Sequence, residues 1–203
     1  VTFGERLVNA IKSNGGPIAK KELLKQFPGV TDIRIVNAIV ADPKLIQWDY
    51  NEFNHIDNVH CTDSDADQLH IILDELLNIQ GGYSSENNFY RAVKNKYPGF
   101  LEKNKIESSL NLFYIAAYLF SKDYRFSRPH IASQAFPDME LTNINVARFF
   151  VADRPELYYQ EFVQISQRAG WSNGTFTIIL NAIEKDYIRV DLNRYIYRSL
   201  FSV

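Results

Sequence analysis

The segment GGPIAKKELLKQFPGV at residues 15–30 has a longer counterpart, GGYSSENNFYRAVKNKYPGF, at residues 81–100. Both begin with Gly-Gly, contain an amphipathic stretch, and end with an aromatic residue, Pro, Gly and an apolar residue. The first segment has 16 residues and the second has 20, a difference of about one helical turn. A helix that gains one turn while its ends keep their chemistry indicates an internal repeat.

A second similarity joins the two ends of the chain. The segment IVNAIVAD at 35–42 resembles ILNAIEKD at 179–186, and WDYNEF at 48–53 resembles VDLNRY at 190–195. The separation along the chain differs by two residues between the first matching pair and the second. This difference falls in the connection between the two matched segments, where insertions are best tolerated. The sequence therefore predicts three consecutive repeats, with boundaries at 1–60, 61–133 and 134–203.

Each repeat is expected to contain three helices followed by a β-hairpin. In repeat 1 we expect helices at 3–14, at 19–27 and from Thr31 or Asp32 to Ala41, then strands at 45–50 and 53–56. The apolar positions of that third helix are Ile33, Val36, Ile39 and Val40. In repeat 2 we expect helices at 65–79, 86–96 and 103–118 and a hairpin around 119–131. In repeat 3 we expect helices at 143–152, 156–169 and 173–185 and strands at 188–192 and 195–201. Linkers are expected at 58–64 and 132–141, and the predicted fold class is mainly α with short β-hairpins in three tandem winged-helix-like units.

Three helices closed by a hairpin make up the winged-helix arrangement. Repeats 1 and 3 resemble the HARE-type helix-turn-helix modules of chromatin-associated and restriction proteins and of a small bacterial polymerase subunit. The resemblance lies in GGPI and KELL within residues 15–24, in the two Asn-Ala-Ile segments and in the short hairpins. It implies that the third helix of a repeat enters the major groove of DNA. Repeat 2 departs from the pattern through its longer middle helix and the run LFYI at 112–115.

Composition excludes several classes of protein. The chain has 203 residues, 46% of them hydrophobic, and a net charge of −2, so it has enough apolar residues for packed cores but no overall basic field. With one cysteine, Cys61, and four histidines, neither a disulfide framework nor a zinc site is expected. No catalytic or nucleotide-binding motif occurs, so we expect no enzyme activity, no cofactor and no small-molecule substrate. Without a membrane-spanning run we expect a cytoplasmic protein, or a nuclear one in a eukaryote, and the start at Val1 suggests a piece of a larger protein.

A local excess of positive charge lies in repeat 2. Residues 86–131 contain eight basic and four acidic side chains. Four lysines flank the predicted turn between the second and third helices, and two arginines lie on the predicted hairpin; they are Lys94, Lys96, Lys103, Lys105, Arg125 and Arg128. When a winged helix binds a DNA duplex, residues of a turn and of the wing contact the phosphates and so fix the protein in place. The open alternatives are a solvated face and a binding site for an acidic partner protein.

Polar side chains at the start of the last helix form a second candidate DNA contact. Arg168, Ser172, Asn173 and Thr175 can hydrogen-bond a base edge or a phosphate. The same Ser-Asn-Gly sequence is a strong helix start signal, so a cap and a turn explain these residues equally well. In repeat 1 the corresponding outward residues are Thr31, Asp32, Arg34 and Asn37, of which one is basic.

The segment TDSDAD at 62–67 imitates the start of a calcium loop. Gln68 replaces the glycine that such a loop requires, and Asp74 occupies the position of its closing glutamate. A helix cap at Ser64 or Asp65 explains the same residues, so no metal site is expected. Aromatic residues at helical spacing, such as Tyr114 and Tyr118, are interpreted as core unless several are exposed together, which would mark a protein-binding face.

The leading hypothesis is a non-catalytic DNA-binding module of a larger transcription- or DNA-processing-related protein. In it the six cations of repeat 2 hold the phosphate backbone, which predicts a salt-dependent affinity for DNA. The alternative is a protein-interaction scaffold without a nucleic-acid partner. A third possibility is an accessory domain of a restriction or repair enzyme whose active site lies elsewhere.

Overall fold

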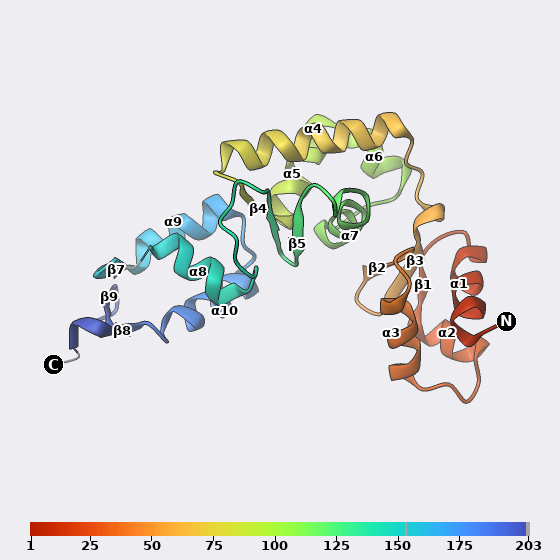
Figure 1. The fold of residues 1–203 in the computed structure, drawn as a ribbon, viewed down its shortest axis with the longest axis horizontal. Coiled ribbons are helices and arrows are strands. Elements are labelled where there is room, and N and C mark those ends of the chain that lie inside the picture. The colour runs from red at the N-terminus through yellow and green to blue at the C-terminus, as the bar shows by residue number, and fades with distance from the viewer. Residues whose placement is uncertain (153, 202–203) are drawn as a thin grey trace. The chain divides into compact units, whose positions relative to one another are not determined.

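The structure is a computed structural model that describes residues 1–152 and 154–201. It is mainly helical, and its strands form three small antiparallel sheets of three strands each (Figure 1). The predicted fold class, mainly α with short hairpins in three units, is therefore confirmed. None of the described helices is both long and apolar enough to cross a bilayer.

The described residues pack into two compact units. Unit 1 comprises Val1–Glu75 and Phe89–Lys122, and unit 2 comprises the described parts of Leu76–Asn88 and Asp123–Val203. The division passes through predicted repeat 2, whose helices contribute mostly to unit 1 and whose sheet belongs to unit 2. The repeat boundaries at 60/61 and 133/134 stay a prediction.

Repeat 1 begins with a helix that is capped at its first turn. The Thr2 hydroxyl accepts from the amide of Glu5, and the Glu5 carboxylate accepts from the amide of Thr2. The elements are α1 (Phe3–Ser13), β1 (Ile18–Ala19), α2 (Lys20–Gln26), α3 (Asp32–Ala41), β2 (Leu45–Asp49), β3 (Glu52–His55) and the 3₁₀ turn η1 (Ile56–Asn58). The strands have the order β1-β3-β2, and Figure 1 shows them beside α1, α2 and α3. The core between them is aliphatic and contains Leu7, Ile11, Leu23, Ile35 and Ile39.

Repeat 2 has the same order of elements, with one additional helix. Its elements are α4 (Asp63–Ile79), β4 (Tyr83–Ser85), α5 (Glu86–Lys96), α6 (Pro98–Lys103), α7 (Ser109–Phe120), β5 (Arg125–Ser127) and β6 (His130–Ala132). The central strand β6 pairs with β4 and with β5. Pro129 lies in the turn of the predicted hairpin, between β5 and β6.

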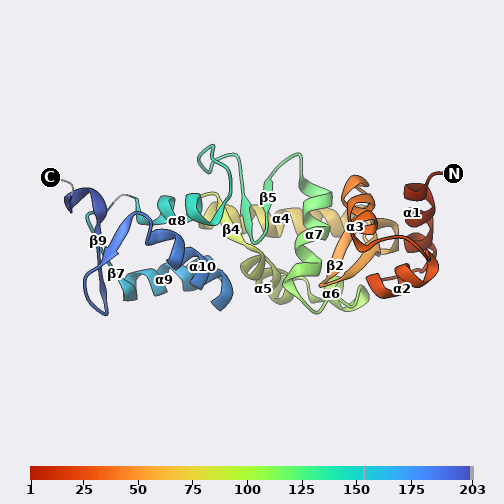
Figure 2. The same cartoon turned by 90° about the horizontal axis from the view of Figure 1, so that it is seen from below.

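Repeat 3 contains α8 (Asn143–Val151), β7 (Glu156–Tyr158), α9 (Tyr159–Ala169), α10 (Asn173–Ile183), β8 (Tyr187–Arg189), β9 (Arg194–Tyr197) and η2 (Arg198–Phe201). The strands have the order β7-β9-β8, and Figure 2 shows β7 and β9 at the end of α8 and α9. The three helices enclose an aromatic core that includes Phe162, Trp171, Tyr187 and Tyr195.

Two predicted helices are wrong in their extent. The helix expected at 103–118 is divided, because Lys105 has a positive φ of 53° and Ser108 starts a new helix by capping Asn111. The helix expected at 156–169 begins three residues later, because residues Glu156–Tyr158 pair with β9 instead. The short strands β1, β4 and β7, which precede the second helix of each repeat, correspond to no expected element.

The apolar face assigned to α3 is wrong in part, because Ile39 is buried as expected but the other three positions are exposed. The core side chains are Ile35 and Ile39, whereas Ile33 and Val40 are 72% and 80% exposed and Val36 is 37% exposed. The helix therefore carries a second apolar stripe, at spacings of three and four residues, on its outer face.

Two adjacent serines in β4 provide a matched test of buried hydrogen bonding. Ser84 and Ser85 are both fully buried, but the Ser85 hydroxyl donates to the carbonyl of Gly170 and accepts from the amide of Asn88. Within the described residues the Ser84 hydroxyl has no partner. We expect Ser85→Ala to lower the free energy of unfolding by about 1–2 kcal/mol and Ser84→Ala to leave it unchanged or raise it slightly, as measured by urea denaturation. Equal losses in the two variants would contradict this assignment.

Candidate functional site

The structure divides the four lysines of the predicted cationic face into two pairs. The ammonium groups of Lys96 and Lys103 form ion pairs with Glu75 and Asp65 of α4. Lys94 and Lys105 instead line a shallow groove. Within residues 1–152 and 154–201 they have no hydrogen-bond or ion-pair partner, but Glu102 and Glu107 line the same groove and balance their charge.

The ion pair of Lys103 belongs to a buried network at the start of α4. The carboxylate of Asp65 accepts from Lys103 Nζ at 2.5 Å, from Tyr97 Oη at 2.5 Å, and from the amide and hydroxyl of Thr62 at 2.8 and 2.9 Å. Burial alone would raise the pKa of Asp65, but these hydrogen bonds outweigh burial and hold the pKa well below its usual value. The calcium-like segment is therefore a helix cap in which Thr62, and not Ser64 or Asp65, is the capping residue. The described part of the chain contains no cluster of side chains that could hold a metal ion.

The two arginines of the predicted wing are committed to contacts within unit 2. The Arg125 guanidinium donates to the carbonyls of Ser133, Phe136, Pro137 and Met139 and so closes the loop that follows β6. The Arg128 guanidinium forms two hydrogen bonds, of 2.9 and 3.3 Å, with the carboxylate of Glu86. A phosphate of DNA would have to displace these partners before it could bind either arginine.

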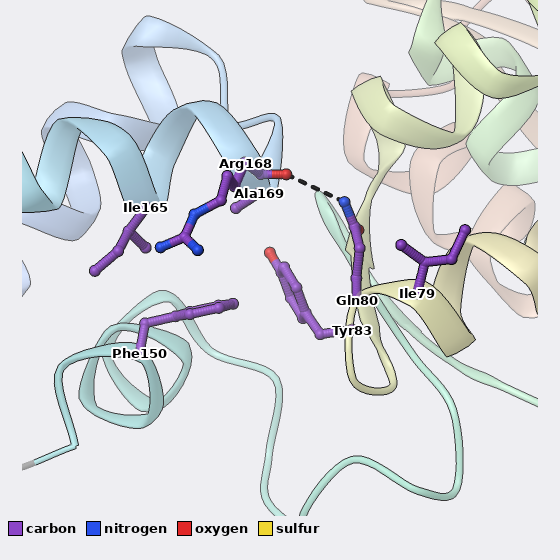
Figure 3. Close-up of a pocket in the computed structure, with 7 residues that line it drawn as sticks. All are labelled: Ile79, Gln80, Tyr83, Phe150, Ile165, Arg168 and Ala169. Carbon is purple, nitrogen blue, oxygen red and sulfur yellow. Dashed lines mark hydrogen bonds between the residues drawn. The ribbon is translucent and has the colours of Figure 1, made fainter.

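The polar residues at the start of α10 form a helix cap. The Ser172 hydroxyl accepts from the amide of Thr175 at 3.1 Å and donates to the Thr175 hydroxyl at 3.0 Å. Asn173 is exposed at the first position of the helix. Arg168 does not join them, because its side chain lines a pocket between α8 and α9 (Figure 3). The role of all ten residues in DNA binding stays a prediction.

Unit 1 contains an apolar groove that the sequence analysis did not predict. It has a volume of about 810 Å³ and lies between α3, β2 and α7. Its lining includes Val36 and Val40 of α3, Leu45 and Ile46 of β2, and Tyr118 of α7. The exposed side chains of Val40 and Tyr118, at 80% and 38%, extend this apolar surface to solvent.

Unit 2 contains a second pocket, of about 470 Å³. Figure 3 shows Phe150 of α8 below it, Ile165 and Arg168 of α9 above it, and Gln80 and Tyr83 at its side. Ile79 and Ala169 complete the lining. Residues 79–83 and 150–169 are too far apart in the sequence for any local pattern to have indicated this pocket.

A chain of buried hydrogen bonds fixes Tyr83, one wall of that pocket. The Trp171 indole donates to Tyr83 Oη at 2.7 Å, and Tyr83 Oη lies 2.7 Å from His130 Nδ1. Asn143 Oδ1 lies 2.8 Å from His130 Nε2 and can only accept, so Nε2 carries the single proton of the neutral ring. Nδ1 then accepts from the Tyr83 hydroxyl. Burial lowers the pKa of His130, with the Asn143 hydrogen bond opposing it only in part, so the imidazole is neutral as this chain requires.

The other histidines and the cysteine do not assemble into a site. His55 is buried at the end of β3, where its Nδ1 accepts from the amide of Asp57. His70 contacts the ring of Phe120 edge to face. Burial raises the pKa of the Cys61 thiol, which disfavours the reactive thiolate.

No family model matches the chain, and no curated protein matches its sequence.

Proposed function

We propose that the chain is a non-catalytic macromolecule-binding module whose partner is a protein and not DNA. The observation that carries this proposal is the outer face of α3. In the DNA-binding modules that repeat 1 resembles, the third helix meets the edges of bases, and polar or basic side chains suit that role. Here that helix presents Ile33, Val36 and Val40 to solvent beside an apolar groove.

The distribution of charge supports the same choice. Of the six cations predicted to hold a phosphate backbone, Lys96, Lys103 and Arg128 are paired with carboxylates and Arg125 is bound to carbonyl groups. The remaining two, Lys94 and Lys105, share a groove with two glutamates. Since phosphate attraction supplies most of non-specific DNA affinity, a net charge of −2 together with the pairing of these cations argues against DNA.

Apolar contact gives a protein partner a reason to bind at this face. Exposed apolar side chains that adjoin a concave apolar surface are typical of interaction sites. A helix or loop of a partner that places two or three apolar side chains against Val36, Val40 and Tyr118 would bury them together. The expected interface is centred on α3 and α7 of unit 1.

The double variant Ile33→Ser, Val40→Ser is expected to abolish retention of the partner without loss of stability, because both side chains point to solvent. The experiment captures proteins from cell extract on the immobilised chain and quantifies them by mass spectrometry. The matched control is Ile178→Ser, Leu192→Ser, which removes two exposed apolar side chains from unit 2. We expect the wild type and the control to retain the same partner and the double variant to lose about nine-tenths of it, since central apolar contacts dominate interface energy.

The competing DNA hypothesis is tested on the same proteins with a fluorescent duplex. We expect no binding at micromolar protein in about 50 mM salt. A micromolar affinity that falls steeply at about 200 mM salt, and that Lys94→Glu with Lys105→Glu removes, would reject the proposal in favour of DNA.

A further inference from the structure

We propose that the partner of the α3 face is a second copy of this chain, bound through a twofold-symmetric contact of unit 1. The inference rests on the proposed function and deepens it, because it names the protein that covers this face. The surface concerned consists of the outer side of α3 and the groove between α3, β2 and α7 (Figure 2). In a twofold dimer, the commonest symmetric oligomer, each copy contributes the same patch to the interface.

Repeat 3 shows that the fold of a repeat does not require apolar residues on this side of the helix. The segment ILNAIEKD in α10 aligns with IVNAIVAD in α3, and the two isoleucines that α3 buries are buried isoleucines in α10 as well. At the two most exposed apolar positions of α3, however, the residues differ in kind. Ile33 corresponds to Thr177, and Val40 corresponds to Glu184. We therefore attribute these two apolar side chains to a contact outside the repeat.

The shape of this face is complementary to itself. Ile33 and Val40 are largely exposed and form a ridge along α3, and the groove begins beside them at Val36. Ile33 lies on the ridge but outside the groove lining, so a peptide that occupied only the groove would leave it in contact with water. Two copies related by a twofold axis place the ridge of each copy in the groove of the other, which covers all of these side chains at once.

The charges of the groove are complementary to themselves too. Among the described residues that line it, the charged ones are Asp42, next to the end of α3, and Lys122, next to the end of α7. Neither forms an ion pair within the described part of the chain. The Asp42 carboxylate is held by Oδ1, which accepts from the amide of Lys44 at 2.9 Å, and this leaves Oδ2 for a cation.

One acid and one base are enough for a symmetric interface. In a twofold contact, a pair formed between two positions is formed twice, once in each direction. Asp42 of each copy can therefore meet Lys122 of the other, and the two identical ion pairs leave no charge of the groove uncompensated. A groove with equal numbers of acids and bases gives little electrostatic preference to a strongly charged foreign partner.

Sedimentation velocity of the whole chain measures the association. We expect a reversible monomer–dimer equilibrium with a dissociation constant of about 1–50 µM at about 0.15 M salt, as is normal for a weak interface. The double variant Ile33→Ser, Val40→Ser is expected to weaken the association by about twentyfold or more, because it removes the ridge. The matched control Ile178→Ser, Leu192→Ser removes exposed apolar side chains of unit 2 and is expected to leave the association unchanged.

Charge reversal tests the pairing of the two copies. Lys122→Asp and Asp42→Lys are each expected to weaken association by about tenfold, because each places like charges opposite each other in both pairs. An equimolar mixture of the two single variants is expected to regain the affinity of the wild type. In the mixed dimer, both pairs again join one lysine and one aspartate. An interface elsewhere on the chain does not predict this recovery.

Asp42→Lys also loses the hydrogen bond to the amide of Lys44, so circular dichroism checks that this variant is folded. If it is not, Lys122→Asp is compared with Lys21→Asp, which reverses an exposed lysine of α2 and is expected to leave the association unchanged. Equal dissociation constants for these two variants, or a mixture of folded charge variants that does not regain affinity, would overturn the inference.

Two further results would overturn the inference without touching the proposed function. One is a chain that stays monomeric at about 200 µM, or a dimer that the double serine variant leaves intact. The other is a captured protein of different sequence, from an extract that also contains this chain. In that case the α3 face binds a protein, as the proposed function states, but the partner is not a second copy.

The proposed function itself fails under a different result, which is capture that does not depend on Ile33 and Val40.

Discussion

Replacing Tyr83 with phenylalanine is expected to lower the free energy of unfolding by about 3 kcal/mol. The change leaves the ring in place and removes only the hydroxyl, which accepts from the Trp171 indole and donates to His130 Nδ1. Both groups are buried, so the loss of the hydroxyl leaves two buried polar groups without this partner. Each buried polar group left without a partner costs about 1–3 kcal/mol, so two such groups give the expected loss.

Tyr195 of the same unit provides the control. It is 1% exposed, as Tyr83 is, but within the described residues its hydroxyl has no hydrogen-bond partner. Tyr195→Phe is therefore expected to leave the free energy of unfolding unchanged or to raise it by up to about 1 kcal/mol. Chemical denaturation of the two variants, followed by tryptophan fluorescence, measures the difference. Losses within about 0.5 kcal/mol of each other would show that the hydrogen-bond chain adds nothing to stability.

The repeats and most of the elements could be predicted from the sequence because their signals are local. The whole of α5 was predicted as the structure has it, and of the two caps offered for α3, Thr31 or Asp32, the structure has Thr31. Thr31 is followed by apolar residues at helical spacing. Gly-Gly precedes β4 and α5. Such signals depend on residues within one or two turns of each other, and they need no knowledge of the tertiary structure.

The face of α3 could not be chosen because its sequence contains two apolar stripes. Ile35 and Ile39 are separated by four residues, and Ile33, Val36 and Val40 by three and four. Either set satisfies the helical period, so periodicity alone does not decide which one packs against α1. The choice depends on the packing of α3 against α1, which is a tertiary property. A helix that is apolar on both faces is itself a signal that the outer face has a partner.

The candidate sites could not be predicted because they depend on pairs far apart in the sequence. The cationic face was inferred from a local excess of lysine and arginine, but Glu75 and Asp65 of α4 pair with Lys96 and Lys103 across more than 20 residues. Similarly, Trp171 and Tyr83 are separated by 88 positions. A count of charges within one segment omits the partners that the fold supplies from other segments, here the carboxylates that pair with Lys96 and Lys103.

The second large effect is expected at Asp65. Asp65→Asn keeps the shape of the side chain but removes the charge that four donors share, and it places an N–H₂ group where the carboxylate accepted. The side chain of Asp65 is 4% exposed. Hydrogen bonds to a buried charge contribute more than neutral ones, so the free energy of unfolding is expected to fall by about 2–3 kcal/mol at neutral pH. The matched control is Glu75→Gln, whose ion pair with Lys96 is half exposed on both sides and is expected to contribute less than about 1 kcal/mol.

The pH dependence separates the charge of Asp65 from its shape. The folded pKa of Asp65 lies below the unfolded value of 3.8, so the folded state holds this proton less tightly than the unfolded state does. The stabilisation is therefore complete above the unfolded pKa and is lost as the pH falls from there toward the folded pKa. In denaturation curves measured between about pH 7 and pH 2, the difference between the wild type and Asp65→Asn should be constant down to about pH 5 and should shrink below it. A difference that stays the same at acid pH would mean that packing of the side chain, and not the carboxylate charge, holds α4 to α6.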